Sequence, residues 1–104
     1  MSNEKVIRAF FRKEVAKTPL RDIQNGCFTY KGRTLEVKIT HSEDGDIVDL
    51  INYSTIIASI VNGRLYVNNK KYSSTTSKLQ TMIKRLAEEY GYSNIGNLNV
   101  EEVR

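Results

Sequence analysis

The residues of this 104-residue chain that could carry out chemistry gather in one stretch, where five hydroxyl side chains precede a lysine. The stretch reads Ser73, Ser74, Thr75, Thr76, Ser77 and Lys78. A serine activated by a lysine can act as a nucleophile. Hydroxyl side chains at the start of a helix also accept hydrogen bonds from the free N–H groups of the first turn, and this capping role explains the run without catalysis. We therefore expect that the protein is not an enzyme.

The other candidates for chemistry are a single cysteine, Cys27, and a single histidine, His41. One cysteine excludes an internal disulfide, and the pair does not form a cluster at zinc-site spacing. Without a histidine or aspartate near it in the pattern, Cys27 is expected to pack as a small apolar residue. His41 precedes an acidic turn over residues 42–46, which lacks the ligand spacing of an EF-hand calcium loop. We expect no cofactor and no metal ion.

A helix is expected to follow the hydroxyl run, because the apolar residues after it repeat at the spacing of one helical face. These residues are Leu79, Met82, Ile83, Leu86, Ala87 and Tyr90. Ser77 and Gln80 have the spacing of a capping box at its start, and Gly91 is a natural stop at its end.

A second amphipathic helix is predicted near the N-terminus, over residues 3–17. Its apolar residues are Val6, Ile7, Phe10, Phe11 and Val15. Ser2 or Asn3 can cap its start. Pro19 should end it at about Thr18, because proline disfavours helical geometry in the residue before it.

Between the helices the sequence predicts strands. Residues 20–25 read as a connector. A hairpin is expected in which residues 27–30 pair with residues 34–40 around the loop 31–33. Residues 47–60 are apolar and β-branched, which favours one strand or two with a kink. Asn62-Gly63 between apolar segments predicts a further hairpin with a type I′ turn.

These elements predict an α+β fold, in which a small antiparallel sheet built from hairpins carries an N-terminal and a C-terminal amphipathic helix on one face. We expect a single domain over residues 1–104, with a tail from about residue 92 that docks loosely. The other face of the sheet is expected to be partly open, which makes that face or its edge a surface for protein binding or for a homodimer.

The net charge of +4 is distributed unevenly along the chain. Residues 1–38 carry nine basic and four acidic side chains, and residues 39–60 carry four acidic and none that is basic. Residues 61–86 then carry six basic side chains and no acidic one. Basic segments of this kind suit a polyanion or an acidic protein patch, and the alternative is a mixed surface that only solvates the protein.

Two sets of candidate contact residues follow from this distribution. The expected partner-binding residues, beside or at the start of the C-terminal helix, are Lys70, Lys71, Tyr72 and Lys78. The residues that would meet nucleic acid, on the faces of the two helices that do not point to the core, are Lys5, Arg8, Arg12, Lys13, Lys84 and Arg85.

No apolar run approaches the 18 residues of a membrane span, and the N-terminus lacks the regions of a signal peptide. We expect a cytoplasmic protein without a membrane partner.

The block over residues 69–80, with residues 53–58 and the Asn62-Gly63 hairpin before it, resembles small domains of unknown function from phages and plasmids of Gram-positive bacteria. In those domains a Tyr-Ser-x-Thr-Thr-Ser-Lys-His-Gln block opens a helix. Leu79 stands here where histidine is common, so no role of that histidine carries over. The resemblance covers roughly residues 50–85 and implies a mobile-element origin with no known activity. Proteins of such elements include anti-CRISPR inhibitors.

The chain is therefore expected to act by binding in one of two ways, of which the first is favoured. In the first, the chain is an anti-CRISPR-type inhibitor that binds a host protein or ribonucleoprotein, such as a CRISPR nuclease with its guide RNA. A basic chain would meet an acidic protein patch or the guide RNA rather than imitate DNA. In the second, the chain is a basic nucleic-acid-binding accessory protein of a phage or plasmid.

Overall fold

The computed structural model describes residues 2–70 and 74–98, apart from the side chain of Asn25. It has two helices, a mixed six-stranded sheet and a separate two-stranded hairpin. The elements are α1 (Asn3–Phe11), β1 (Ala16–Lys17), β2 (Arg21–Asn25), β3 (Phe28–Gly32), β4 (Leu35–Ser42), β5 (Gly45–Asn52), β6 (Thr55–Val61), β7 (Arg64–Val67), α2 (Ser74–Glu89) and β8 (Gly96–Asn97).

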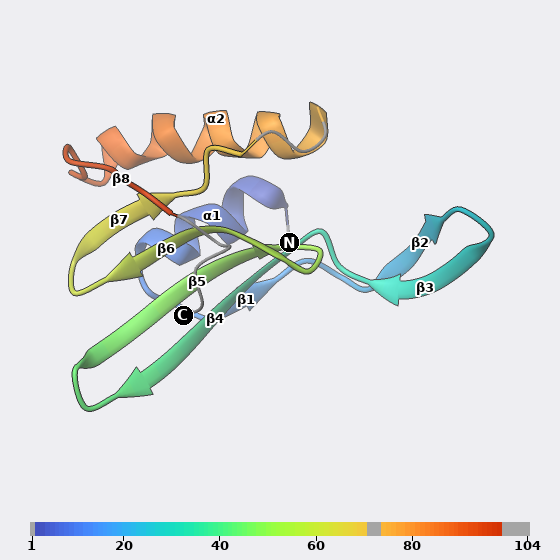
Figure 1. Ribbon diagram of the computed structural model, residues 1–104, viewed down its shortest axis with the longest axis horizontal. Helices are drawn as coiled ribbons and strands as arrows, with labels where there is room; N and C mark the ends of the chain where they lie inside the picture. Colours follow the sequence, from blue (N-terminus) through green and yellow to red (C-terminus); the bar gives the residue numbers. More distant parts are fainter. Residues whose placement is uncertain (1, 71–73, 99–104) are drawn as a thin grey trace.

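The body of the molecule has two layers, with α1 and α2 on one face of the sheet (Figure 1). The strand order is β1-β4-β5-β6-β7-β8, and every pair is antiparallel except β7–β8. The α+β class and the two helices are confirmed. The sheet is larger than predicted, because two-residue strands at both edges and a split of residues 47–60 bring it to six strands.

The core lies between the sheet and the helices. Alternate residues of the strands, among them Val37, Leu50, Ile60 and Leu65, are at most 1% exposed on the helix side. Their neighbours along the strands point to the other face, as the period of two requires. Phe10 is fully buried between the layers.

The N-terminal helix is shorter than predicted, since it ends at Phe11 and residues 12–17 leave it. The N–H of Lys13 donates to the Phe10 carbonyl and that of Glu14 to the Ala9 carbonyl, a Schellman motif with Lys13 at φ 59°. Val15 was predicted in the apolar face of the helix and is instead 71% exposed. Pro19 therefore plays no part in ending this helix.

The predicted pairing of residues 27–30 with residues 34–40 is wrong. Phe28–Gly32 pairs with Arg21–Asn25, the segment that was predicted as a connector, and β4 pairs with β5 and β1. The turn lies at Gly26-Cys27, where Gly26 has φ +63°, as the first central residue of a type II′ turn requires. Cys27 does not pack in the core, because it lies in this turn and is exposed.

The other turns agree with the sequence. Residues 47–60 form two strands that pair around Tyr53-Ser54, so the second of the two predicted alternatives holds. Asn62 and Gly63 have φ of 52° and 77° between the paired residues Val61 and Arg64, which confirms the predicted hairpin.

The C-terminal helix buries its predicted face. Leu79, Ile83, Leu86 and Ala87 are buried, and Met82 and Tyr90 pack against the core from its margin. Gly91 ends the helix at φ +84° as predicted. The capping box is wrong, because α2 begins at Ser74, so Ser77 lies inside the helix.

The chain after α2 returns to the sheet. Gly96 and Asn97 pair with Tyr66 and Val67, and the Leu98 N–H donates to the Val67 carbonyl. In the described part of the chain, no helix is both long enough and apolar enough to cross a membrane.

Candidate functional site

The arginines predicted to meet nucleic acid are engaged within the protein. The Arg8 guanidinium lies 3.4 Å from Glu4 and 3.1 Å from Glu89, and the Arg85 guanidinium lies 3.4 Å from Glu4. The hydrogen bond with Tyr90, and then that with Glu89, holds the pKa of Arg8 above its usual value. This network ties α1 to α2. Arg12 pairs in the same way with Glu14, beyond the end of α1.

The predicted lysines are different. Lys5, Lys13, Lys78 and Lys84 are exposed, and the described residues offer none of them an ion pair within 4 Å. The positive charge that the helix layer offers to a binding partner therefore comes from lysines. They are spread over α1, its end and α2, so they do not form one continuous patch along a single element.

The start of α2 is fixed to the sheet by two buried polar side chains. The Thr76 hydroxyl donates to Asn52 Oδ1 at 2.8 Å, and the Asn52 amide donates to the Thr34 carbonyl at 2.9 Å. Gln80 Nε2 donates to the carbonyls of Asn68 and Lys70, at 2.5 and 3.1 Å. These bonds explain why a hydroxyl and an amide occur on the buried side of the helix.

The same bonds position the predicted partner-binding residues. Gln80 holds the backbone of Lys70 against α2, while the side chains of Lys70 and Lys78 are exposed. Lys71 and Tyr72 lie outside the described residues. Of the four predicted partner-binding residues, the structure therefore describes two: Lys70, which precedes α2, and Lys78, which lies in its second turn.

The charges of α2 run against its dipole. The first turn has no acidic residue and the last turn no basic one, whereas Glu88 and Glu89 lie at the C-terminal end. A helix arranged for stability has the opposite pattern, with acids first and bases last. The charges at the two ends of α2 are therefore not explained by the stability of the helix.

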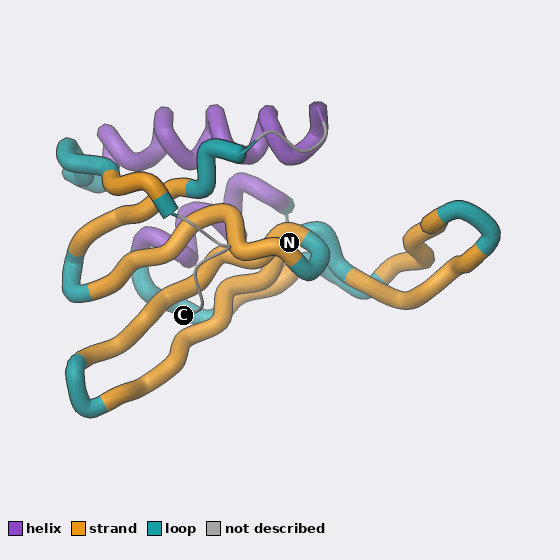
Figure 2. Tube along the Cα trace, in the orientation of Figure 1, coloured by secondary structure: helices purple, strands orange, loops and turns teal. Residues whose placement is uncertain are grey.

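The second surface is the β2–β3 hairpin, which projects from the body as a separate arm (Figures 1 and 2). We call this hairpin the arm. Because residues opposite each other in an antiparallel pair share a face, Ile23 and Tyr30 lie on one side with Phe28 near the tip and with Arg21 and Gly32 at the base. The other side carries Asp22 and its cross-strand partner Lys31, which form an ion pair at 2.6 Å.

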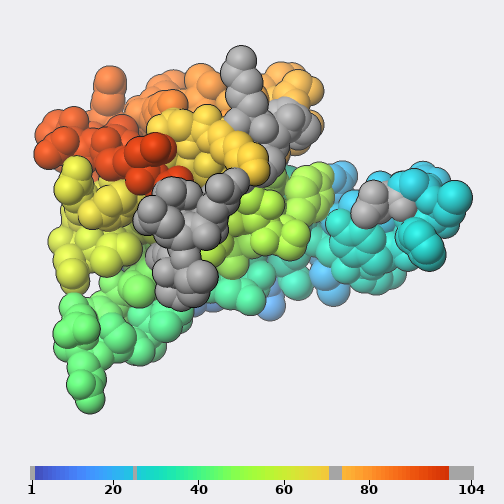
Figure 3. Space-filling model, in the orientation of Figure 1, coloured from blue at the N-terminus to red at the C-terminus, as the bar shows by residue number. Residues whose placement is uncertain are grey.

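None of the described residues covers the apolar face of the arm. Phe28 is 77% exposed and Tyr30 is 46% exposed. Of the six large apolar side chains exposed in the described residues, four belong to the arm or its base, namely Leu20, Phe28, Tyr30 and Tyr53. In space-filling view the arm stands clear of the two-layer body (Figure 3). An amphipathic ribbon without a covering layer is a typical binding surface.

A groove of about 370 Å³ lies at the base of the arm. It is lined by Leu20, Ile23, Tyr30, Lys31, Gly32, Arg33, Tyr53 and Ser54. The Arg21 guanidinium donates to the hydroxyl of Tyr53, one of the lining residues, at 2.7 Å. Three of its lining residues, Ile23, Tyr30 and Gly32, lie on the face that carries Phe28 at the tip, and Lys31 borders the groove from the other face.

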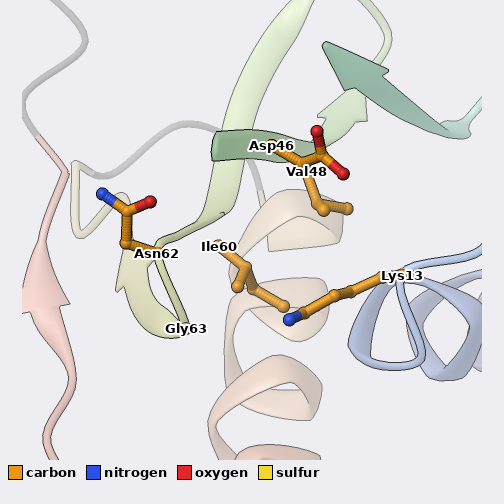
Figure 4. A pocket seen from close by; sticks show the side chains of 6 residues that line it. All are labelled: Lys13, Asp46, Val48, Ile60, Asn62 and Gly63. Atoms are coloured by element: carbon orange, nitrogen blue, oxygen red, sulfur yellow. The ribbon is translucent and has the colours of Figure 1, made fainter. Parts of the chain in front are cut away.

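A smaller pocket of about 190 Å³ lies where the end of α1 meets the turns of the sheet (Figure 4). Val48 and Ile60 form its apolar wall, with Lys13 reaching toward Ile60. Asp46, beside Val48, hydrogen-bonds His41 at 2.8 Å. The pocket is smaller than the roughly 300 Å³ at which ligand pockets begin.

The arm was missed by the sequence analysis, although Asn25-Gly26 and the alternation of Phe28-Thr29-Tyr30 are typical of a hairpin.

Within the described residues, no three histidine, cysteine, aspartate or glutamate side chains are placed to hold a metal ion. Comparison with known protein families, curated proteins and solved structures gave no match to this chain.

Proposed function

We propose that this protein is encoded by a phage or plasmid and acts by binding, without catalysis, as an anti-CRISPR-type inhibitor of a host nuclease complex. Its contact surface is the N-terminal half of α2 together with Lys70. The observation that carries the proposal is the arrangement of exposed lysines around the start of a helix that is fixed to the sheet from its buried side.

The charge and the anchoring of the start of α2 support this proposal. Lys78 is exposed in the N-terminal half of α2, and it has no acidic partner within the described residues. The bonds of Thr76 and Gln80 hold this end of the helix in place, so the exposed side chains need little ordering when a partner binds. An acidic patch on a protein, or the phosphates of a guide RNA, complements these lysines.

The test is a DNA cleavage assay with a guide-loaded CRISPR nuclease from a Gram-positive host. The expected result is that the parent protein inhibits cleavage and that Lys70→Glu with Lys78→Glu weakens inhibition by at least about tenfold, since reversed charges face the same partner. The matched control is Lys17→Glu with Lys38→Glu, which makes an equal change of charge at exposed positions elsewhere. Equal inhibition by all three proteins would overturn the contact surface.

Salt dependence separates this function from nucleic-acid binding. If the protein binds duplex DNA, the logarithm of its affinity should fall by about 0.9 per log unit of salt for each phosphate contacted. Binding to the apo-nuclease with a shallow salt dependence supports an acidic protein patch as the target. Tight binding to free DNA, without inhibition, would replace the proposed inhibitor with a nucleic-acid-binding protein.

A further inference from the structure

The apolar face of the arm carries a protruding side chain at one end and a groove at the other. Phe28, at the tip, is 77% exposed. The groove at the base is bordered by Tyr53, 38% exposed, and Leu20, 54% exposed. Four residues of strand separate the two ends, which is roughly 13 Å. The arm is a ribbon, so its own tip cannot reach its own base.

From this geometry we infer that the arm is a dimerisation element, and that its occupant is the arm of a second copy of this chain. In the dimer the two arms pack antiparallel, face to face, about a two-fold axis. Phe28 of one copy then enters the groove beside Leu20 and Tyr53 of the other, and the same contact occurs twice. A surface that is complementary to itself in this way gives a closed dimer rather than a fibre.

The charges of the arm are compatible with this arrangement. Two cations lie at the base, Arg21 on the apolar face itself and Arg33 beyond the end of the paired segment. Each already has a partner, Arg21 the Tyr53 hydroxyl and Arg33 the Thr18 carbonyl. In the antiparallel arrangement the two bases lie at opposite ends, roughly one ribbon length apart and beyond the Debye length of about 8 Å at physiological salt. The acidic side chain of the arm, Asp22, lies on the opposite face with Lys31.

Nucleic acid is the less suitable occupant. Phosphate binding would use Arg21, Lys31 and Arg33, but Lys31 is paired with Asp22 and both arginines are hydrogen-bonded within the protein. The apolar face also includes aliphatic side chains, Leu20 and Ile23, which cannot stack on bases as aromatic ones do. Aliphatic and aromatic side chains together suit a protein surface.

The size of the contact predicts a weak dimer. Two aromatic side chains and their aliphatic neighbours from each copy would bury roughly 1,000 Å² in total, near the lower limit for a specific interface. We therefore expect the dimer to dissociate on dilution. This inference does not depend on the proposed inhibitor function, because its tests need only the purified protein.

The first test is sedimentation velocity from about 1 µM to about 500 µM, over which a weak dimer changes population by mass action. The parent protein should move from monomer to dimer. Phe28→Asp should weaken dimerisation by at least about 30-fold, because it places a charge in the apolar contact. Thr29→Asp, on the polar face beside it, is the matched control and should dimerise normally. The inference is overturned if the parent protein is monomeric at all of these concentrations, or if the Phe28→Asp variant dimerises as strongly as the parent protein.

The second test uses the single cysteine of the chain to determine how the two arms are oriented relative to each other. Cys27 lies next to Phe28, and Ser54 is exposed at the rim of the groove. In the Ser54→Cys variant, diamide should oxidise the two thiols to a disulfide between copies while it takes up their two protons and two electrons. Ser93→Cys is the control at an exposed position away from the arm. The antiparallel dimer predicts cross-linking only for Ser54→Cys, and its loss when Phe28→Asp is added.

Cross-linking of the parent protein through Cys27 alone would mean that the tips meet each other, and would overturn the antiparallel arrangement. Equal cross-linking of Ser54→Cys and Ser93→Cys would show random collision and would also overturn it. Circular dichroism of each variant checks the fold. All of the substituted positions are exposed, so the fold should be retained.

Discussion

Two hairpins of this protein have the same local design and opposite surroundings. In the β6–β7 hairpin one face carries Ile60 and Leu65, which are at most 1% exposed under the helix layer. In the β2–β3 arm one face carries Tyr30 and Phe28, which are 46% and 77% exposed. Each hairpin has a two-residue turn containing a glycine with positive φ. The difference lies in what covers the apolar face.

The comparison shows that alternation along a strand identifies a face but not its partner. The helices cover β6–β7 because α2 follows β7 directly and returns over it (Figure 1). The arm branches from the chain between β1 and β4, and no helix adjoins it in sequence. An apolar face that is left uncovered by the described part of the chain is a candidate contact surface, which is the basis of the dimer inferred above.

The largest expected effect separates the two hairpins by their role in stability. Leu65→Ala should lower the free energy of unfolding by about 2–5 kcal/mol, since it leaves a cavity in the core. Phe28→Ala should change it by less than about 0.5 kcal/mol, because the side chain is exposed in the monomer. Urea unfolding followed by circular dichroism, at a concentration where the protein is monomeric, measures both. A large loss for Phe28→Ala would mean that the arm is part of the cooperative body.

The next prediction concerns the bonds that hold the covering helix in place. Gln80→Ala should cost about 1–3 kcal/mol, because the carbonyls of Asn68, which is buried, and Lys70 lose a donor. Thr81→Ala, one position later, is the control. The Thr81 hydroxyl is exposed and bonds only within its own helix, so its loss should be nearly neutral. Equal unfolding free energies for the two variants in urea would show that Gln80 does not anchor α2.

The turns of the two hairpins give a smaller effect and a direct contrast. Gly63 and Gly26 have φ of +77° and +63°, and a Cβ at either position would meet no atom within 4 Å. Alanine therefore costs only its left-handed backbone, about 1–2 kcal/mol. Gly63→Ala should show this cost in global unfolding. Gly26→Ala should leave global unfolding unchanged and instead speed hydrogen exchange at the amides of the arm. The reverse assignment of the two effects would contradict the separation of arm and body.

What the sequence predicts well in this protein is local and repeated. The face of α2, its end at Gly91 and the Asn62-Gly63 turn each follow from several residues that agree. What it predicts poorly depends on a choice between distant partners. A turn was possible at both Gly26 and Gly32. The register depends on which strands pair, and no single segment of the sequence contains that information.

The candidate site shows the same division. The sequence placed Lys78 correctly on the exposed side of α2, because the apolar pattern fixes that side. It could not show that Arg8 is engaged with Glu89 or Arg85 with Glu4, since each of these pairs joins residues about 80 positions apart. Nor could it show that Thr76 and Gln80 bind Asn52 and Asn68, which are contributed by the sheet and by the loop before the helix.

The smallest expected effect compares the two helices that cover the body. Both end in a Schellman motif, with Gly91 at φ +84° after α2 and Lys13 at φ 59° after α1. A side chain in this conformation costs about 1–2 kcal/mol, and part of the gain from glycine is offset by the greater freedom of glycine in the unfolded chain. Lys13→Gly should therefore stabilise the protein by about 0.5–1 kcal/mol, whereas Gly91→Ala should destabilise it by about 1 kcal/mol.

The control for Lys13→Gly is Lys13→Ala, which keeps the strained backbone and removes the side chain that reaches toward Ile60 (Figure 4). If backbone strain decides the effect, alanine should be nearly neutral and only glycine should stabilise, as measured by urea unfolding of the three proteins. If both substitutions destabilise equally, the aliphatic stem of Lys13 contributes more by covering Val48 and Ile60 than its backbone costs. That outcome would place Lys13 among the residues that cover the sheet, and would remove it from the set of exposed lysines available to a partner.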